Sequence, residues 1–168
     1  MVRHKGSVLV DTNVILECQR TDSWRALANG YELETVEDCV SETQTGFQLR
    51  RDELLIDEHG LRFSLKAIHE VQASARAKLS IEVPDIHLDQ GEAALWAHAR
   101  SRIDNWVFCG PDKASLRVGI RLGYRARLVS LEQLLTDVGH RPRYKLKPAY
   151  TSKWHRTSMN QLGLEESG

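Results

Sequence analysis

The sequence predicts an α/β protein of three layers, in which helices cover both faces of a central, mostly parallel sheet. Short segments with strand character, at 7–10, 33–36, 106–109 and 127–129, alternate with segments of helical character. Those at 7–10 and 106–109 are mostly apolar, which is typical of strands that are buried on both faces. Strands that alternate with helices favour a parallel sheet, and Gly, Pro and capping residues at the junctions support the same division.

In the first third of the chain, the strand at 7–10 delivers Asp11 at its carboxyl end. Helices are expected over 13–20, 22–29 and about 38–45. Thr21 or Asp22 can cap the second of these helices, and Gly30 can end it because glycine readily adopts a left-handed conformation.

The segment from about 46 to 80 is predicted to be an insertion. Residues 54–56 and 61–63 are apolar and flank the sequence DEHG at 57–60, which is a plausible four-residue turn of a β-hairpin. Apolar residues then recur at spacings of three and four from Leu65 to Leu79, which predicts a helix.

Three further helices are expected in the second half, over 91–102, 112–123 and 131–138. The last has Ser130 as its N-cap and Gln133 at the position of a capping box. Beyond it the chain is basic, contains two prolines and shows no clear periodicity, so residues 140–168 are predicted to form a tail that lies on the surface or becomes ordered on a partner.

The length of 168 residues fits one domain, with a folded part at 1–139. No apolar run approaches the ~18 residues that span a bilayer, and the N-terminus leads directly into a strand, so a cytoplasmic protein is expected. Cys18, Cys39 and Cys109 share no close spacing, which argues against a disulfide framework or a CxxC site.

The formal net charge of zero conceals a division along the chain. Residues 1–112 contain 12 Lys/Arg and 19 Asp/Glu, whereas residues 113–156 contain 11 Lys/Arg and two Asp/Glu. An acidic centre beside a basic surface suits a metal-dependent enzyme that acts on a polyanion. A solvated surface on which charges happen to segregate is the alternative.

Four acidic residues stand where a parallel sheet would bring them together. Asp11 and Asp112 follow the first and third strands, and Glu42 and Glu92 lie in helices that follow strands. Because ligands of open α/β sheets bind outside the carboxyl ends of the strands, these acids can converge on one crevice. Clustered carboxylates without a His or Cys at ligand spacing favour Mg²⁺ or Mn²⁺.

Four blocks of the sequence, in order, resemble the PIN-domain nucleases (PilT N-terminus-like). They are VLVDTNVIL at 8–16, VSET at 40–43, LDQGEA at 88–93, and GPDKA at 110–114 with Leu122 and Gly123. The resemblance extends from residue 7 to about 138 and is closest to the toxin-type members of toxin–antitoxin pairs. The 46–80 segment is longer than compact toxin-type members require, and the basic tail is additional.

The resemblance implies a metal site formed by Asp11, Glu42, Glu92 and Asp112. Thr12, Asn13 and Asp89 would support it. The implied activity is hydrolysis of RNA phosphodiester bonds by an endoribonuclease that depends on Mg²⁺ or Mn²⁺. The implied partners are an RNA substrate, an inhibitory antitoxin-type protein and a second copy of the chain.

Each acid also has a purely structural interpretation. Asp89 and Glu92 have the spacing of a capping box, Asp112 can cap its helix, and Glu42 can be a solvated helix residue. Asp11 is the exception, because an acid directly after an apolar strand is costly to bury without a partner or a metal.

Basic residues of the second half could bind the RNA backbone. Arg117, Arg121 and Arg125 recur every four residues and would line one helix face, with Arg127, Lys145 and Lys147 nearby. Two other functions stay open: an RNA-processing or structure-specific nuclease on the same fold, and a catalytically weak domain that binds RNA or takes part in assembly. The absence of GxSxG, P-loop and GxGxxG motifs argues against triad hydrolases, NTPases and dinucleotide enzymes.

Overall fold

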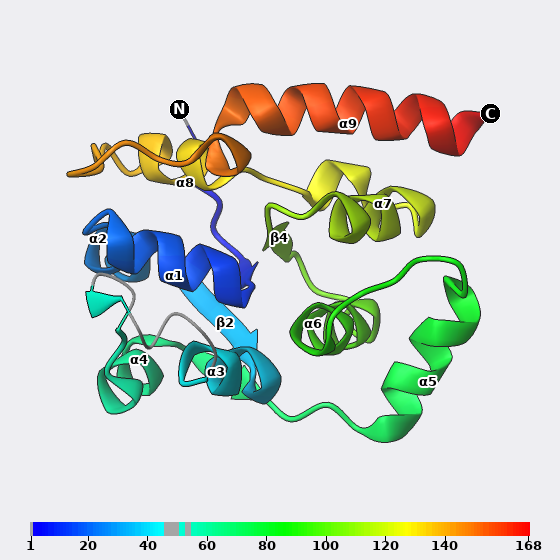
Figure 1. The fold of residues 1–168 in the computed structure, drawn as a ribbon, viewed down its shortest axis with the longest axis horizontal. Coiled ribbons are helices and arrows are strands. Elements are labelled where there is room, and N and C mark those ends of the chain that lie inside the picture. The colour runs from blue at the N-terminus through cyan, green and yellow to red at the C-terminus, as the bar shows by residue number, and fades with distance from the viewer. Residues whose placement is uncertain (1, 46–50, 53–54) are drawn as a thin grey trace.

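The computed structural model describes residues 2–45, 51–52 and 55–168, and it has the predicted α/β/α architecture (Figure 1). The central sheet has the order β3-β2-β1-β4, and all of its pairings are parallel. Its strands are β1 (Ser7–Val10), β2 (Glu32–Val36), β3 (Ala67–His69) and β4 (Val107–Cys109).

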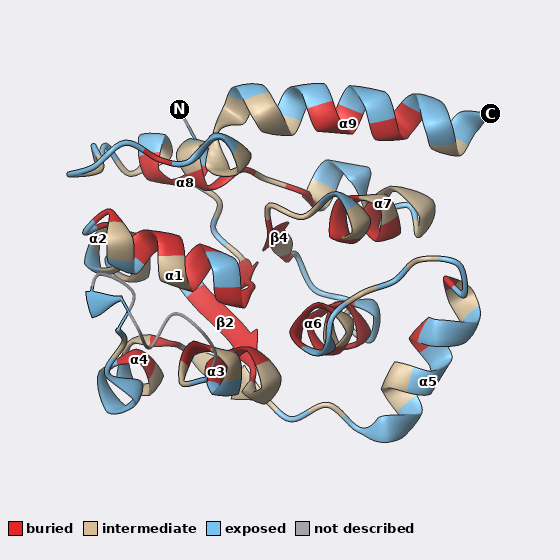
Figure 2. Ribbon diagram, viewed as in Figure 1, coloured by how far each residue is buried: buried red, intermediate tan, exposed pale blue. Residues whose placement is uncertain are grey.

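The central strand β1 is buried on both faces, as its apolar sequence predicts. Val8 pairs with Leu33 of β2 and with Val107 of β4, which fixes the register of all three strands. Leu9 belongs to the hydrophobic cluster on one face of the sheet, whereas Val8 and Val10 belong to the cluster on the other. Figure 2 shows burial concentrated on the sheet and on the helix faces directed toward it.

Helices cover both faces and complete the three layers. The cluster with Val8 and Val10 is built with α1 (Thr12–Arg20), α2 (Trp24–Gly30), α4 (Glu58–Ser64) and α8 (Leu131–Asp137). The cluster with Leu9 is built with α5 (Ala73–Glu82), α6 (Gln90–Arg100), α7 (Lys113–Arg121) and α9 (Ser152–Ser167). The remaining α-helix of the described residues, α3 (Glu37–Thr43), follows β2 directly and contributes one residue to each cluster.

The predicted hairpin around 57–60 was wrong where the structure describes it, because this segment starts α4. The Asp57 side chain accepts a hydrogen bond from the backbone N–H of Gly60, at 2.8 Å, and so caps the helix. Leu54, in the first predicted arm, lies outside the described residues. The residues that resembled a turn are therefore an N-cap and a first helical turn, which favour the same residue types.

The helix predicted from Leu65 to Leu79 was wrong in its first half. Residues 67–69 form the edge strand β3, in which Ile68 pairs with Thr35 of β2, and α5 begins only at Ala73. The apolar spacing of three between Leu65 and Ile68 cannot distinguish a helix from a short strand preceded by a helix end. The partner strand decides between them.

The fourth predicted strand, at 127–129, is reduced to a single bridge. Residues 125–127 form the 3₁₀ helix η3 (Arg125–Arg127), and Leu128 alone forms a parallel bridge with Phe108 of β4. Leu128 thus extends the sheet beyond β4 by one residue.

The prediction that residues 140–168 form a surface tail was also wrong. They contain the 3₁₀ helix η4 (Pro148–Tyr150) and the sixteen-residue helix α9, which lies along α7 (Figure 1). Met159 and Leu162 of α9 are buried in the same cluster as Leu9, and Leu146 is buried in the other cluster. The C-terminal segment is therefore part of the core.

The remaining expectations from composition can be compared with the structure. The three cysteines are free and buried. Among the residues that the structure describes, no helix has the length and apolar character needed to cross a membrane.

Candidate active site

The predicted acids are positioned by the carboxyl ends of β1 and β4. Asp11 directly follows Val10 of β1, and Asp112 lies three residues after Cys109 of β4. From β1 the chain continues to β2 and β3 on one side, whereas β4 lies on the other side. The β1–β4 boundary is therefore the topological switch point of the sheet, where α/β folds usually bind ligands.

Asp11 is buried and only half satisfied. One carboxylate oxygen, Oδ1, accepts a hydrogen bond from the backbone N–H of Val14, at 2.9 Å, and caps α1. The other oxygen, Oδ2, is buried without a hydrogen-bond partner. A Cβ atom on Gly110 would lie 3.1 Å from this oxygen, so the glycine lets the β4–α7 loop pass close to the carboxylate.

Glu92 and Asp89 form the reciprocal capping box that their spacing predicts. The backbone N–H of Glu92 donates to Asp89 Oδ1 at 2.8 Å, and the backbone N–H of Asp89 donates to Glu92 Oε2 at 3.1 Å. Asp89 is exposed, whereas Glu92 is buried. Capping occupies one oxygen of Glu92, and among the described residues Oε1 makes no hydrogen bond.

Asp112 is the N-cap of α7 and follows the same rule. Its Oδ1 accepts from the backbone N–H of Ser115 at 3.1 Å, and no described group donates to Oδ2. Asp11, Glu92 and Asp112 thus each use one oxygen at a helix N-terminus and retain a second. The partial positive charge of the three helix termini stabilises the carboxylates that meet there.

Glu42 is held differently, because both of its oxygens already accept hydrogen bonds. Thr12 Oγ1 donates to Oε2 at 2.8 Å, and the backbone N–H of Gly91 donates to Oε1 at 2.8 Å. The carboxylate therefore connects α1, α3 and the start of α6. Asn13, the other predicted supporting residue, is exposed in the first turn of α1.

Burial and repulsion from neighbouring carboxylates raise the pKa values of Asp11, Glu92 and Glu42. Burial raises the pKa of Asp11 to about 8, and the charges of Glu92, Asp89 and Asp112 add to the rise. Burial and the charge of Asp112 raise the pKa of Glu92 to about 7. The pKa of Glu42 is also raised, mainly by burial. Glu92 and Asp112 act on Asp11, and Glu42 acts on Glu92, so we treat Asp11, Glu42, Glu92 and Asp112 as one electrostatic unit, the acidic site.

The donor set of the acidic site fits a hard divalent cation. The buried Asp11 Oδ2 has no partner, the charges of Glu92 and Asp112 act on Asp11, and each of these two acids has a second oxygen that capping does not use. These acids are not among the groups of three ligand atoms that lie within 4.8 Å of one another in the described part of the chain. With this spacing, one or two of the carboxylates would contact Mg²⁺ or Mn²⁺ directly and the others would reach it through its water ligands, several of which Mg²⁺ usually keeps.

A group that the sequence did not predict, Glu34, His69 and His98, does bring three such ligand atoms within 4.8 Å. The His69 and His98 rings stack with centroids 3.9 Å apart, and His69 Nε2 lies 2.6 Å from Glu34 Oε1. However, the Arg102 guanidinium donates to both Glu34 oxygens and lies 3.3 Å from His98 Nε2. A cation therefore already neutralises this carboxylate, which argues against a metal there.

The predicted basic stripe on α7 is largely neutralised by α9. Arg117 forms ion pairs with Glu165 and Glu166, and Arg121 forms them with Glu166 and Asp85. The sequence did not place these partners, because the chain beyond 139 was predicted to be a tail.

The other predicted basic residues differ in their surroundings. The Arg127 guanidinium stacks over the Trp106 ring, 4.6 Å from its centroid, and donates to the Trp106 carbonyl. Arg125, Lys145 and Lys147 are exposed. Arg125, Lys145 and Lys147 therefore remain accessible to a ligand.

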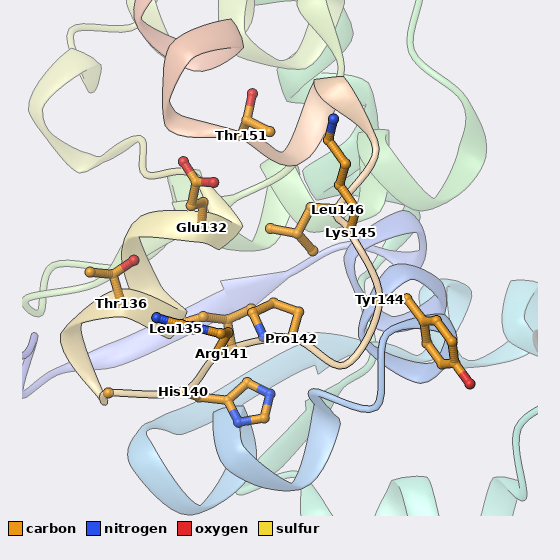
Figure 3. A pocket seen from close by; sticks show the side chains of 11 residues that line it. Glu132, Leu135, Thr136, His140, Arg141, Pro142, Tyr144, Lys145, Leu146 and Thr151 are labelled. Atoms are coloured by element: carbon orange, nitrogen blue, oxygen red, sulfur yellow. The ribbon is translucent and has the colours of Figure 1, made fainter.

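A cavity of about 520 Å³ lies between α8 and the segment that follows it (Figure 3). Its walls include Leu135, Arg141, Pro142, Lys145 and Leu146. None of the four predicted catalytic acids lines this cavity, so it is separate from the acidic site.

Comparison of the chain with protein-family models, curated proteins and solved structures gives no match.

Proposed function

We propose that this chain is a metal-dependent endoribonuclease that hydrolyses RNA phosphodiester bonds at the acidic site. The observation that carries the proposal is the buried Oδ2 of Asp11, which has no partner and lies in the field of three further carboxylates. Such an arrangement is costly unless a cation completes it. Its place at the switch point of the sheet is where a substrate would reach it.

Asp11, Glu92 and Asp112 would hold Mg²⁺ or Mn²⁺ through the oxygens that capping leaves available. A bound divalent cation would supply an activated water at neutral pH and neutralise charge that develops on the phosphate. The caps on α1, α6 and α7 fix the direction of each carboxylate. Glu42 positions the starts of α1 and α6 through Thr12 and Gly91, and its direct ligation stays a prediction.

The resemblance to the PIN-domain nucleases makes RNA the expected substrate. It also supports a toxin-type role in the cytoplasm, with an inhibitory antitoxin-type protein as partner and a homodimer as the assembly. A catalytically weak domain that binds RNA is the alternative of another class. Retention of the oxygen ligands at all three helix termini favours the enzyme.

The test is cleavage of a mixed pool of single-stranded and structured RNAs in Mn²⁺, in Mg²⁺ and in EDTA. We expect cleavage with either metal and none in EDTA. Asp11→Asn should reduce cleavage by roughly 100-fold or more, because asparagine preserves the cap but removes the ligand charge. Binding of RNA without cleavage in any metal would support the RNA-binding alternative instead.

The third acidic block provides a matched pair of variants that separates ligation from capping. Glu92→Gln can still complete the capping box, so it should lose activity and metal affinity with little change in melting temperature. Asp89→Asn changes the charge of the other member of the same box and should retain most of the activity. Equal activity in the two variants would remove Glu92 from the metal site.

A further inference from the structure

A second pocket, of about 620 Å³, lies where η3 and the start of α8 face α9. We call it the arginine pocket, and the residues that define it are Arg125, Ser130, Ser152, His155, Arg156 and Asn160. These residues come from two segments of the chain, 125–130 and 152–160, that are brought together by the packing of α9.

The arginine pocket is basic, and its charges are not neutralised within the described protein. No Asp or Glu lines it, and neither Arg125 nor Arg156 forms an ion pair with a described residue. This differs from Arg117 and Arg121, whose guanidinium groups are paired with carboxylates of α9 and Asp85. The pocket is therefore the part of the basic half that retains its charge for an anion.

Close packing against α9 holds Arg125 in place. A Cβ atom on Gly163 would lie 3.1 Å from Arg125 Cζ and would overlap Nη1, so only glycine allows the guanidinium to lie against this turn of the helix. Gly163 is buried and lies within a helix, where glycine is less favourable than alanine. Because Gly163 has no side chain, the Arg125 guanidinium can lie against α9.

Polar groups complete the lining. The Ser130 and Ser152 hydroxyls are 3.0 Å apart, and each can rotate to donate to a bound oxygen. The Asn160 side chain adds an amide donor. Guanidinium, hydroxyl and amide donors without a competing carboxylate form a set that suits a phosphate group.

The arginine pocket also lies close to the loop between β4 and α7. Ser130 and His155 line a small internal void of about 10 Å³ as well as the pocket, and the lining of that void includes Gly110 and Pro111. Gly110 is the residue that passes beside Asp11 Oδ2, and Pro111 precedes Asp112. The arginine pocket therefore lies close to the β4–α7 loop, which passes beside Asp11 and leads to Asp112.

We propose that the arginine pocket binds a backbone phosphate of the RNA strand that the acidic site cleaves. This inference rests on the proposed function. It assigns RNA binding to Arg125 and Arg156 and not to Arg117 and Arg121 of α7. It also assigns α9 a role in holding substrate.

The test measures binding of a fluorescently labelled single-stranded RNA by anisotropy, in EDTA to prevent cleavage, over a series of salt concentrations. The double variant Arg125→Gln/Arg156→Gln should weaken binding roughly fivefold or more and reduce the log–log salt slope by about 0.7, the value for one lost phosphate contact on a single strand. Lys153→Gln is the matched control, because it removes a positive charge from the exposed face of α9 outside the pocket. It should change the affinity less than twofold.

Gly163→Ala separates geometry from net charge. It retains every basic residue but displaces Arg125, so it should weaken RNA binding while a circular-dichroism spectrum confirms the fold. Unchanged affinity in the double variant, or an equal loss in Lys153→Gln, would overturn the proposal.

A melting experiment with Mn²⁺ distinguishes failure of this proposal from failure of the proposed function. The double variant should keep the wild-type rise in melting temperature, because its acids are untouched. If RNA binding depends on the arginine pair but neither Mn²⁺ stabilisation nor cleavage is found, RNA binding by the pocket is supported and the nuclease function is refuted. If cleavage depends on Asp11 but the double variant has unchanged RNA affinity, the nuclease function is supported and RNA binding by the pocket is refuted.

Discussion

Replacing Asp11 by asparagine should stabilise the metal-free protein while abolishing its response to metal. Asparagine is a good N-cap, so its Oδ1 can still accept the hydrogen bond from Val14. Its second side-chain group is neutral and does not repel the carboxylates of Glu92 and Asp112. The substitution therefore removes a buried titratable group without removing the cap.

The size of the effect follows from the pKa of Asp11, which rises from 3.8 to about 8 on folding. Above pH 3.8 the unfolded chain releases this proton and the native state keeps it, so the free energy of unfolding falls as pH rises, until about pH 8. At pH 7 the accumulated loss is about 4 kcal/mol, at 1.36 kcal/mol per pH unit. Asparagine does not titrate, so the variant should be more stable at pH 7 by about 2 to 4 kcal/mol.

The assay is urea unfolding of both proteins in EDTA at pH 5, 7 and 8.5, repeated with millimolar Mn²⁺. The stability difference should grow with pH in EDTA, and at pH 7 it corresponds to a melting temperature higher by roughly 4 to 16 °C for a chain of this size. Mn²⁺ should stabilise the wild type by mass action and leave the variant almost unchanged.

Glu70→Gln is the control, because Glu70 is exposed and forms no hydrogen bond or ion pair with a described residue. It should leave both the pH dependence and the Mn²⁺ response as in the wild type. If Asp11→Asn shows the wild-type pH dependence and the wild-type gain from Mn²⁺, Asp11 is neither a strained carboxyl nor a ligand, and the reasoning fails.

Three further outcomes are expected. Mn²⁺ affinity should rise from pH 6 to pH 8, because Asp11 and Glu92, with pKa values of about 8 and 7, must lose protons to bind a cation. A calorimetric Mn²⁺ affinity that does not change with pH would contradict this. Gly91→Ala should lower the free energy of unfolding by about 1 to 3 kcal/mol, since its Cβ would lie 2.6 Å from Glu42 Oε2 and disrupt the partly buried hydrogen bond from Gly91 to Glu42. Wild-type stability in a denaturant titration would contradict this. Deletion of residues 140–168 should cost at least about 3 kcal/mol or prevent folding, because α9 buries two large apolar side chains in the core; a wild-type melting curve would show that α9 is dispensable.

The sequence by itself determined the features that depend on neighbouring residues. The apolar run before Asp11 predicts a buried strand because both of its faces must avoid water. The caps at Asp89, Asp112 and Ser130 were predictable because each side chain bonds a backbone N–H three residues later. These local signals were enough for the α/β/α class and for the ends of the strands from which the acids project.

Local signals could not decide where two structures share one residue pattern. The cap and first turn of α4 have the composition of a hairpin turn, and the start of the predicted 65–79 helix has apolar spacing that also fits a strand. Pairing of Ile68 with Thr35 of β2 determines the strand, and it joins residues more than thirty positions apart.

Only the tertiary structure decided which charges are free. In the sequence, Arg117, Arg121 and Arg125 are equivalent members of one helical stripe. The packing of α9 on α7 pairs the first two with Glu165 and Glu166, whereas Arg125 lies against Gly163 with no carboxylate beside it. The availability of a charge depends on groups within about 4 Å of it. Here those groups are carboxylates of α9, which come from more than forty positions away in the chain. They are brought to α7 because α9, a helix without strong periodicity of its own, buries its apolar face there.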